Sequence, residues 1–280
     1  MTIPTRTLPD DPTAVLPPAA TVPASPRRPG RALLVGAGIV LAVVTVGYGC
    51  LVLVNVLGRR TYRSTQRFPL THVVQLQGSD DQLTIVPDAV DHVVVQQTVR
   101  RGIQHTRGSN VVDAAGVLHL GVRCPEWVPT SCDIATTVHV PADLDVRGSL
   151  LDGSITASGL HGSFHVSTGD GSVHLDRQVG DVWIASGDGT VRLSELRARH
   201  VAVTTGDGSV SIDLAAPPDT VVLHSGDGSV NLAVPDDGTP YAVTTSTGDG
   251  SVHNDLGNDP RASRRIDVHT GDGSVHLSYG

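Results

Sequence analysis

The chain has 280 residues, a formal net charge of −8 and only 3% aromatic residues. From Pro141 to Gly280 it holds 19 Asp and Glu against 8 Arg. Since an acidic surface repels a phosphate backbone, this composition argues against a nucleic-acid partner.

Residues 1–31 read as a disordered, proline-rich tail, because eight prolines and no apolar periodicity occur between Met1 and Gly30. The 26 residues from Ala32 to Leu57 carry no charge and would form a helix of about 39 Å, against about 30 Å of hydrocarbon. A transmembrane helix is therefore expected over residues 32–57. A cleaved signal peptide is the alternative, but its apolar part usually has about 7–15 residues and follows a short leader.

The next two segments are less regular. Residues 58–70 are expected to be a linker. Residues 71–140 show period-two alternation without a repeated motif, as in Val73-Val74-Gln75-Leu76, and predict strands that cap the following domain.

Cysteines suggest the orientation of the chain, because arginines flank the apolar run on both sides. Cys124 and Cys132 bracket seven residues, a spacing that suits a disulfide across a surface loop. Such a bridge would add about 2–3 kcal/mol and would persist only in an oxidising compartment. We therefore expect the N-terminus to be cytoplasmic and the C-terminal domain extracellular. A metal pair is the alternative, although no second Cys or Cys-His pair lies nearby.

A repeat dominates residues 141–280. Six copies of Thr/Ser-Gly-Asp-Gly-Ser/Thr-Val follow a weaker copy at Asp152, and successive aspartates are 18, 18, 19, 20, 22 and 23 residues apart. Alternating strands flank each Gly-Asp-Gly, which we interpret as a tight bend in which glycine adopts positive φ. The sequence thus predicts an all-β, single-stranded β-solenoid with coils of 18–23 residues and two or three strand faces per coil. The chain stops without an obvious cap, so the last coil is expected to be an exposed stacking surface.

The cadence Val-x-Val-x-Thr/Ser-Gly-Asp-Gly-Ser-Val, preceded by the segment from Val138 to Leu144, resembles the bacterial β-strand-repeat family labelled "putative adhesin", a domain of unknown function. The likeness covers roughly Val73 to Gly280. It implies a β-solenoid on the cell surface or in the envelope and brings no catalytic residues. All 20 basic residues other than histidine are arginine, which is typical of a GC-rich bacterial genome. Together with the apolar run of residues 32–57, this suggests a membrane-anchored, actinobacterial-type member of the family.

The repeated residues supply the candidate sites. One aspartate per coil would form a column that either is solvated or binds calcium weakly, namely Asp170, Asp188, Asp207, Asp227, Asp249 and Asp272. Hydroxyl ladders are expected from Thr168, Ser186, Thr205, Ser225, Thr247 and Thr270. His253 and His276 are expected on adjacent coils, where they and His174 are solvated or form a surface metal pair.

The connection opposite the bend varies in length, and solenoids often bind partners at such an edge. Its arginines are the ligand candidates: Arg197, Arg199, Arg261, Arg264 and Arg265. No hydrolase, zinc-protease or phosphate-loop motif occurs. We therefore expect no enzyme and no cofactor other than calcium. The expected function is a membrane-anchored adhesin or envelope-binding module for an anionic wall polymer, glycan or surface protein. The alternatives are a self-associating scaffold and an envelope-stress sensor.

Overall fold

The computed structural model describes residues 30–57, 60–71, 73–78, 81–101, 107–108, 110–123 and 133–280. The chain divides into two compact units, residues 1–51 and 52–280. The predicted tail up to residue 29, and both cysteines of the predicted disulfide, lie outside the described residues.

Helix α1 runs from Gly30 to Leu57. Its stretch Val35–Leu53 has a mean hydropathy of 2.2, and none of it is buried against the protein. A helix of 28 residues is about 42 Å long, enough to cross about 30 Å of hydrocarbon. Within the described ranges α1 is the one helix long and apolar enough to span a membrane.

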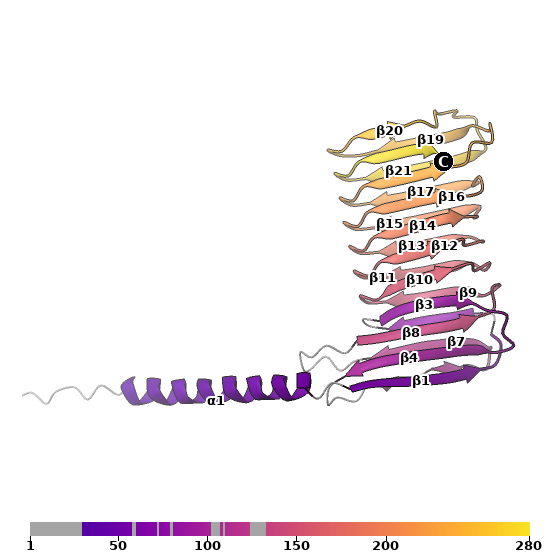
Figure 1. Cartoon of the computed structure of the whole chain (residues 1–280). Coiled ribbons are helices and arrows are strands. Elements are labelled where there is room, and N and C mark those ends of the chain that lie inside the picture. The colour runs from indigo at the N-terminus through magenta and orange to yellow at the C-terminus, as the bar shows by residue number, and fades with distance from the viewer. Residues whose placement is uncertain are drawn as a thin grey trace, which may run out of the picture. The chain divides into compact units, whose positions relative to one another are not determined.

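The strands form two long sheets (Figure 1). The first sheet has the spatial order β1 (Arg60–Phe68), β4 (Val93–Arg101), β8 (Asp133–Val140), β3 (Asp81–Pro87), β10 (Ser154–Ser158), β12 (Val173–Asp176), β14 (Val191–Leu196), β16 (Val210–Leu214), β18 (Val230–Val234), β22 (Val275–Tyr279) and β20 (Val252–Asn254).

The second sheet has the order β19 (Tyr241–Ser246), β21 (Arg264–Thr270), β17 (Thr220–Ser225), β15 (His200–Thr205), β13 (Val182–Ser186), β11 (Phe164–Thr168), β9 (Asp145–Leu150), β2 (Val73–Gly78), β7 (Val117–Arg123) and β5 (Arg107–Gly108), and β6 (Val111–Val112) also pairs with β7.

Each regular coil contributes one strand to each sheet. In the coil of β11 and β12, the chain runs along the second sheet, turns at Gly169-Asp170-Gly171 and returns along the first sheet. Neighbouring coils pair in parallel, for instance β11 with β13 and β12 with β14. The coil therefore has two strand faces, which decides between the two arrangements that the sequence allowed.

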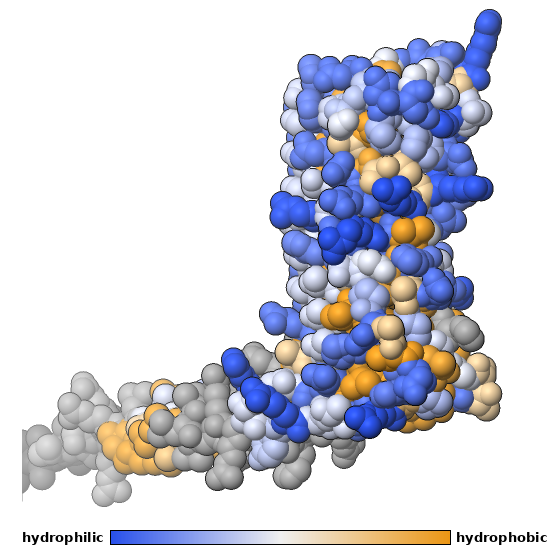
Figure 2. Space-filling view, turned by 45° about the vertical axis from the view of Figure 1, so that its right-hand side comes forward, coloured by the Kyte–Doolittle hydropathy of each residue, from blue (hydrophilic) through white to orange (hydrophobic). Residues whose placement is uncertain are grey.

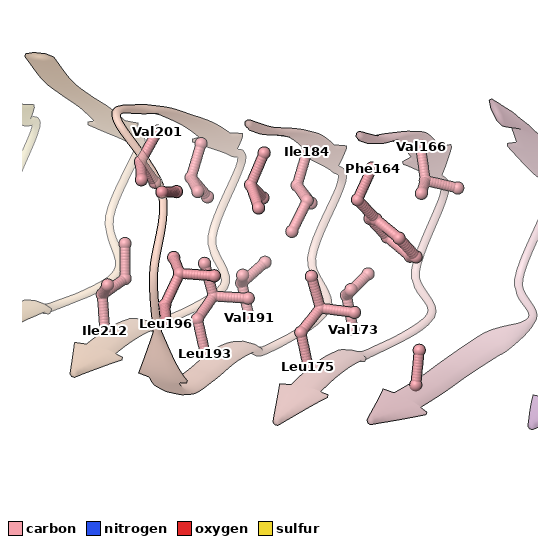
Figure 3. Close-up of a cluster of buried hydrophobic side chains, with 14 of the residues drawn as sticks. Phe164, Val166, Val173, Leu175, Ile184, Val191, Leu193, Leu196, Val201 and Ile212 are labelled. Atoms are coloured by element: carbon pink, nitrogen blue, oxygen red, sulfur yellow. The ribbon is translucent and has the colours of Figure 1, made fainter. Parts of the chain in front are cut away.

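The core is a narrow layer of aliphatic side chains between the sheets. Figure 3 shows Phe164 and Val166 from the second sheet facing Val173 and Leu175 from the first, all at most 1% exposed. This pattern repeats coil after coil, because period-two alternation places every second side chain inside. Each fully buried aliphatic side chain contributes about 1.5–3 kcal/mol.

Glycine is required at the corner for space and not for positive φ. The corner glycines are not among the residues with positive φ. A Cβ at Gly189 would lie only 2.1 Å from the carbonyl oxygen of Gly171 in the coil below. The first glycines form a hydrogen-bond ladder, in which Gly187 N donates to Gly169 O at 2.6 Å and Gly206 N to Gly187 O at 2.7 Å. The predicted reason for these glycines was thus wrong, although their place in a bend was right.

The column of Thr and Ser before each corner is buried except at the half-buried Thr247, and its hydroxyls do not bond to one another. Instead, each donates to a glycine carbonyl of the neighbouring coil, as Thr168 Oγ1 does to Gly153 O at 3.0 Å and Ser225 Oγ to Gly208 O at 3.2 Å. The predicted hydroxyl ladder is therefore replaced by hydrogen bonds that tie each strand to the next corner.

The N-terminal part of the β unit differs from the prediction in two ways. Strands β2, β3, β7 and β8 pair in parallel with the solenoid and add two coils to it. Only β1 and β4 close the first sheet in antiparallel fashion. The predicted linker at residues 58–70 is wrong, because nine of its residues form β1.

The last two coils are stacked in reverse order. Strands β21 and β22 lie against β17 and β18, while β19 and β20 form the outer end (Figure 1). The spacing of 22 residues, from Asp227 to Asp249, therefore joins two coils that are not neighbours, whereas the spacing of 23 residues joins two neighbours stacked in reverse order.

The outer end is capped on its β19 side, which corrects part of the prediction, whereas Val252 on β20 is 42% exposed. In the connection between β20 and β21, Asn258 Oδ1 accepts a hydrogen bond from Val243 N at 3.0 Å, and Asp259 N donates to Tyr241 O at 2.9 Å. Leu256 in the same connection is only 6% exposed. These bonds occupy part of the outer edge of β19, which reduces its tendency to pair with another chain.

We predict that Gly189→Ala strongly destabilises the solenoid, by at least about 2 kcal/mol, because the added methyl group would overlap a backbone carbonyl. Asp188→Ala, at the adjacent exposed position, is the control and should not destabilise the protein, because its side chain overlaps nothing and its removal relieves carboxylate repulsion. Chemical denaturation of both variants measures the difference. Equal stability of the two would contradict the close stacking of the corners.

Candidate functional site

The six candidate calcium aspartates are all exposed at the corner. Their carboxylates lie one per coil, and each points toward the next corner, as shown by the 3.4 Å hydrogen bond from Asp207 N to Asp188 Oδ1. Calcium takes six to eight oxygen ligands. Across the described ranges, no three His, Cys, Asp or Glu side chains gather closely enough to hold a metal. The geometry is a line of single carboxylates.

We predict that Asp207→Asn raises the melting temperature at low salt. Carboxylates about 4.8 Å apart repel by about 1 kcal/mol per neighbour in water, and the substitution removes two such contacts. The gain should shrink as salt is added. Thermal denaturation with and without calcium tests this, since a calcium-bridged column would instead be destabilised by Asp207→Asn when calcium is present.

The arginine candidates lie in or beside the return connections, as predicted, but they do not form a uniformly basic edge. Arg197, Arg199, Arg261 and Arg265 are exposed. The same connections also contain aspartates, namely Asp181, Asp219, Asp236 and Asp259. The edge is therefore of mixed charge.

Arg264 has a structural role. Its guanidinium bonds to Asp237 at 2.8 Å and lies 5.7 Å from the ring centroid of Tyr241, and its side chain is only 21% exposed. The hydrogen bond from Arg264 lowers the pKa of Asp237, and that carboxylate in turn raises the pKa of Arg264. Because these contacts already occupy Arg264, it is a poor ligand candidate.

The histidine prediction is confirmed in one respect. His253 and His276 lie on paired strands, and their rings stack with centroids 5.0 Å apart and an interplanar angle of 5°. His253 also lies 3.1 Å from Asp255. His174 is elsewhere, on β12, between Thr156 and Arg192 of the neighbouring strands. The three histidines therefore do not form one site.

A strip on the outer face of the second sheet was not predicted. Arg147, His165 and Trp183 occupy the same register on β9, β11 and β13, pointing outward from the core. Trp183 is 42% exposed, and its ring contacts the His165 ring with centroids 5.3 Å apart. Arg147 is also exposed and lies 3.9 Å from Asp145. We call these three residues the Trp183 strip.

The Trp183 strip lies among small side chains on one side, and its nearest carboxylates are Asp145 and Asp181, at the starts of β9 and β13. The next outward position on β13 is Ala185, and Ala202 lies beside Trp183 on β15. The two central outward columns from β9 to β17 contain no carboxylate, in a region where acids outnumber arginines by 11. They consist of Arg147, Ser149, His165, Ser167, Trp183, Ala185, Ala202, Thr204, Val222 and His224.

One signal in the sequence could have revealed the strip. Arg147, His165 and Trp183 are 18 residues apart, the same interval as the first repeats. Residues one period apart in a solenoid lie side by side.

The β unit is a parallel two-sheet solenoid in which six coils share a Gly-Asp-Gly corner, and within the described residues one apolar helix precedes it. The chain belongs to the Toastrack DUF4097 family, whose profile matches residues 134–278.

Solved structures that match the chain include one described as a "putative cell adhesion protein" from Clostridium sporogenes, at 10% identity and a TM-score of 0.37, covering 79% of this chain and 100% of that one. A "putative adhesin" from Parabacteroides merdae has 10% identity and a TM-score of 0.42, with 78% and 96% covered. A "putative lipid binding protein" from Parabacteroides distasonis has 11% identity and a TM-score of 0.39, also with 78% and 96% covered. No curated protein matches the chain.

Proposed function

We propose that this chain is a single-pass membrane protein whose solenoid is a non-enzymatic binding module for an anionic envelope polymer or glycan. Helix α1 is the anchor, the N-terminus is cytoplasmic and the solenoid is extracellular. The observation that carries the proposal is the pair of outward columns that contain the Trp183 strip and no carboxylate from β9 to β17.

The strip offers the chemistry that such a ligand needs. An indole ring provides a flat apolar surface on which the face of a sugar ring can stack, and its N–H remains available as a donor. The Arg147 guanidinium can bind a carboxylate or phosphate through two parallel hydrogen bonds. Because Ala202 on β15 and Ala185 on β13 are small, a polymer can approach the indole ring from the side opposite His165.

The residues repeated in every coil support a non-enzymatic role. The Thr and Ser hydroxyls before the corners donate hydrogen bonds to glycine carbonyl oxygens. A nucleophile needs one uniquely activated group, whereas these hydroxyls are equivalent and buried.

The structure at the C-terminal end of the stack argues against the alternative of a self-associating scaffold. Self-association through the last coil would need a free outer edge on β19. Asn258 and Asp259 already bond to that edge at Val243 and Tyr241. The envelope-stress sensor would depend on the N-terminal tail, which lies outside the described residues.

We predict that the full-length protein in detergent co-sediments with purified bacterial cell wall and that Trp183→Ala weakens this binding about tenfold, because it removes the stacking surface. Arg192→Ala is the matched control, since Arg192 is exposed on the outer face of the other sheet beside His174. It should bind like the wild type.

Two results would count against the proposal in different ways. If the wild type stays in the supernatant, recognition of wall polymer is wrong. If the wild type pellets but Trp183→Ala pellets equally well, the protein binds wall through another surface and the strip is not the site.

A further inference from the structure

The first strand of the β unit is basic and exposed, unlike the acidic solenoid that follows. Strand β1 carries Arg60, Arg63 and Arg67 and no carboxylate. It is the edge strand of its sheet, since β1 pairs only with β4. The side chains of Arg63 and Arg67 are exposed. The carboxylate of Asp91, which interacts with Arg67, already accepts a hydrogen bond from His92.

Apolar side chains are exposed at the same end of the stack. Tyr62 on β1 is 46% exposed, Leu70 just after β1 is 52% exposed and Val111 on β6 is 54% exposed. The hydrogen bond from Asn110 Nδ2 to Gln66 Oε1, at 2.9 Å, holds the start of β6 close to β1. In Figure 2 the orange residues of the solenoid are densest at the base of the column, over these N-terminal strands.

The chain itself keeps this surface near the end of helix α1. Only Gly58 and Arg59 separate Leu57 from β1, so the start of the strand lies within about 11 Å of the last helical residue. Electrostatic attraction acts over about 8–10 Å at physiological salt. If α1 spans the membrane, β1 is therefore within reach of the lipid headgroups.

We propose that the N-terminal end surface of the solenoid docks on the anionic phospholipid surface of the membrane through both sides of its edge strand β1. Arg63 and Arg67 project on the outer side of β1 and Tyr62 on the side of the core, and Leu70 and Val111 complete this end surface. Arginines near such a surface are attracted by the lipid phosphates, and tyrosine and leucine are stable at the interface between headgroups and acyl chains. This proposal rests on the anchoring part of the proposed function and is independent of the glycan ligand.

The charge pattern favours lipid over a second copy of the chain as the partner. Two copies meeting through this surface would bring Arg63 and Arg67 of one close to those of the other, because a two-fold interface places the same patch on both sides. An anionic membrane would instead attract these arginines. The acidic corners lie in the coils beyond this end surface, so they would not contact the anionic lipids.

The test uses the full chain, one copy per nanodisc, in discs of phosphatidylcholine alone or with phosphatidylglycerol. Hydrogen exchange is measured at the backbone amides of residues 61–70. We expect exchange to be about thirtyfold slower with phosphatidylglycerol at low salt, because two arginines gain about 1 kcal/mol each near an anionic surface. Exchange in residues 241–254, at the far end of the stack, should be the same in both discs.

The double variant Arg63→Glu and Arg67→Glu should lose the slowing, whereas Arg192→Glu, on the outer face of the solenoid, should keep it. High salt should also abolish it. Exchange that is equal in the two kinds of disc would overturn the proposal, and so would slowing that survives the double variant. Cell-wall binding by the same variants separates this outcome from failure of the glycan site, since the Trp183 strip is unchanged in them.

Discussion

The close stacking of one glycine corner on the next is the constraint on which the rest of the structure depends. At the second glycine of the motif, the carbonyl of the coil below leaves no room for a Cβ. The first glycine donates its N–H to the equivalent glycine of that coil, and the preceding Thr or Ser donates its hydroxyl to a corner carbonyl. These contacts fix the height and register of both strands in each coil.

Once the register is fixed, the core and the surface follow. Aliphatic residues at alternate positions fall into continuous columns, so a layer of small side chains is enough to fill the space between the sheets. Outward residues fall into columns as well, which brings Arg147, His165 and Trp183 together on one flat face. A chain that repeats its turns thus builds one face from single residues of separate coils, and the N-terminal end of the stack presents a second surface of different chemistry.

Local patterns were sufficient to predict the helix, the alternating strands and the place of the bends. They did not predict β1, because Arg60–Phe68 lacks apolar alternation and is a strand only through its pairing with β4. They also missed the reversed order of the last two coils, since nearly identical corners can stack on one another in either order. The Trp183 strip was readable from its 18-residue spacing, whereas the role of Arg264 depends on Asp237, which lies 27 residues away.

Reversal of the last two coils gives the stack a cap, because it lets the connection between β20 and β21 bond to the end strand. The most direct test of the stacking is a comparison of two double-cysteine variants, with the bridges mapped by mass spectrometry. Asn231 and His276 are paired neighbours, whereas His253 lies one strand further from Asn231. Adjacent strands are about 4.8 Å apart, and disulfides need Cα atoms within about 7 Å. The account predicts a bridge in Asn231→Cys with His276→Cys and none in Asn231→Cys with His253→Cys, and the opposite result would contradict it.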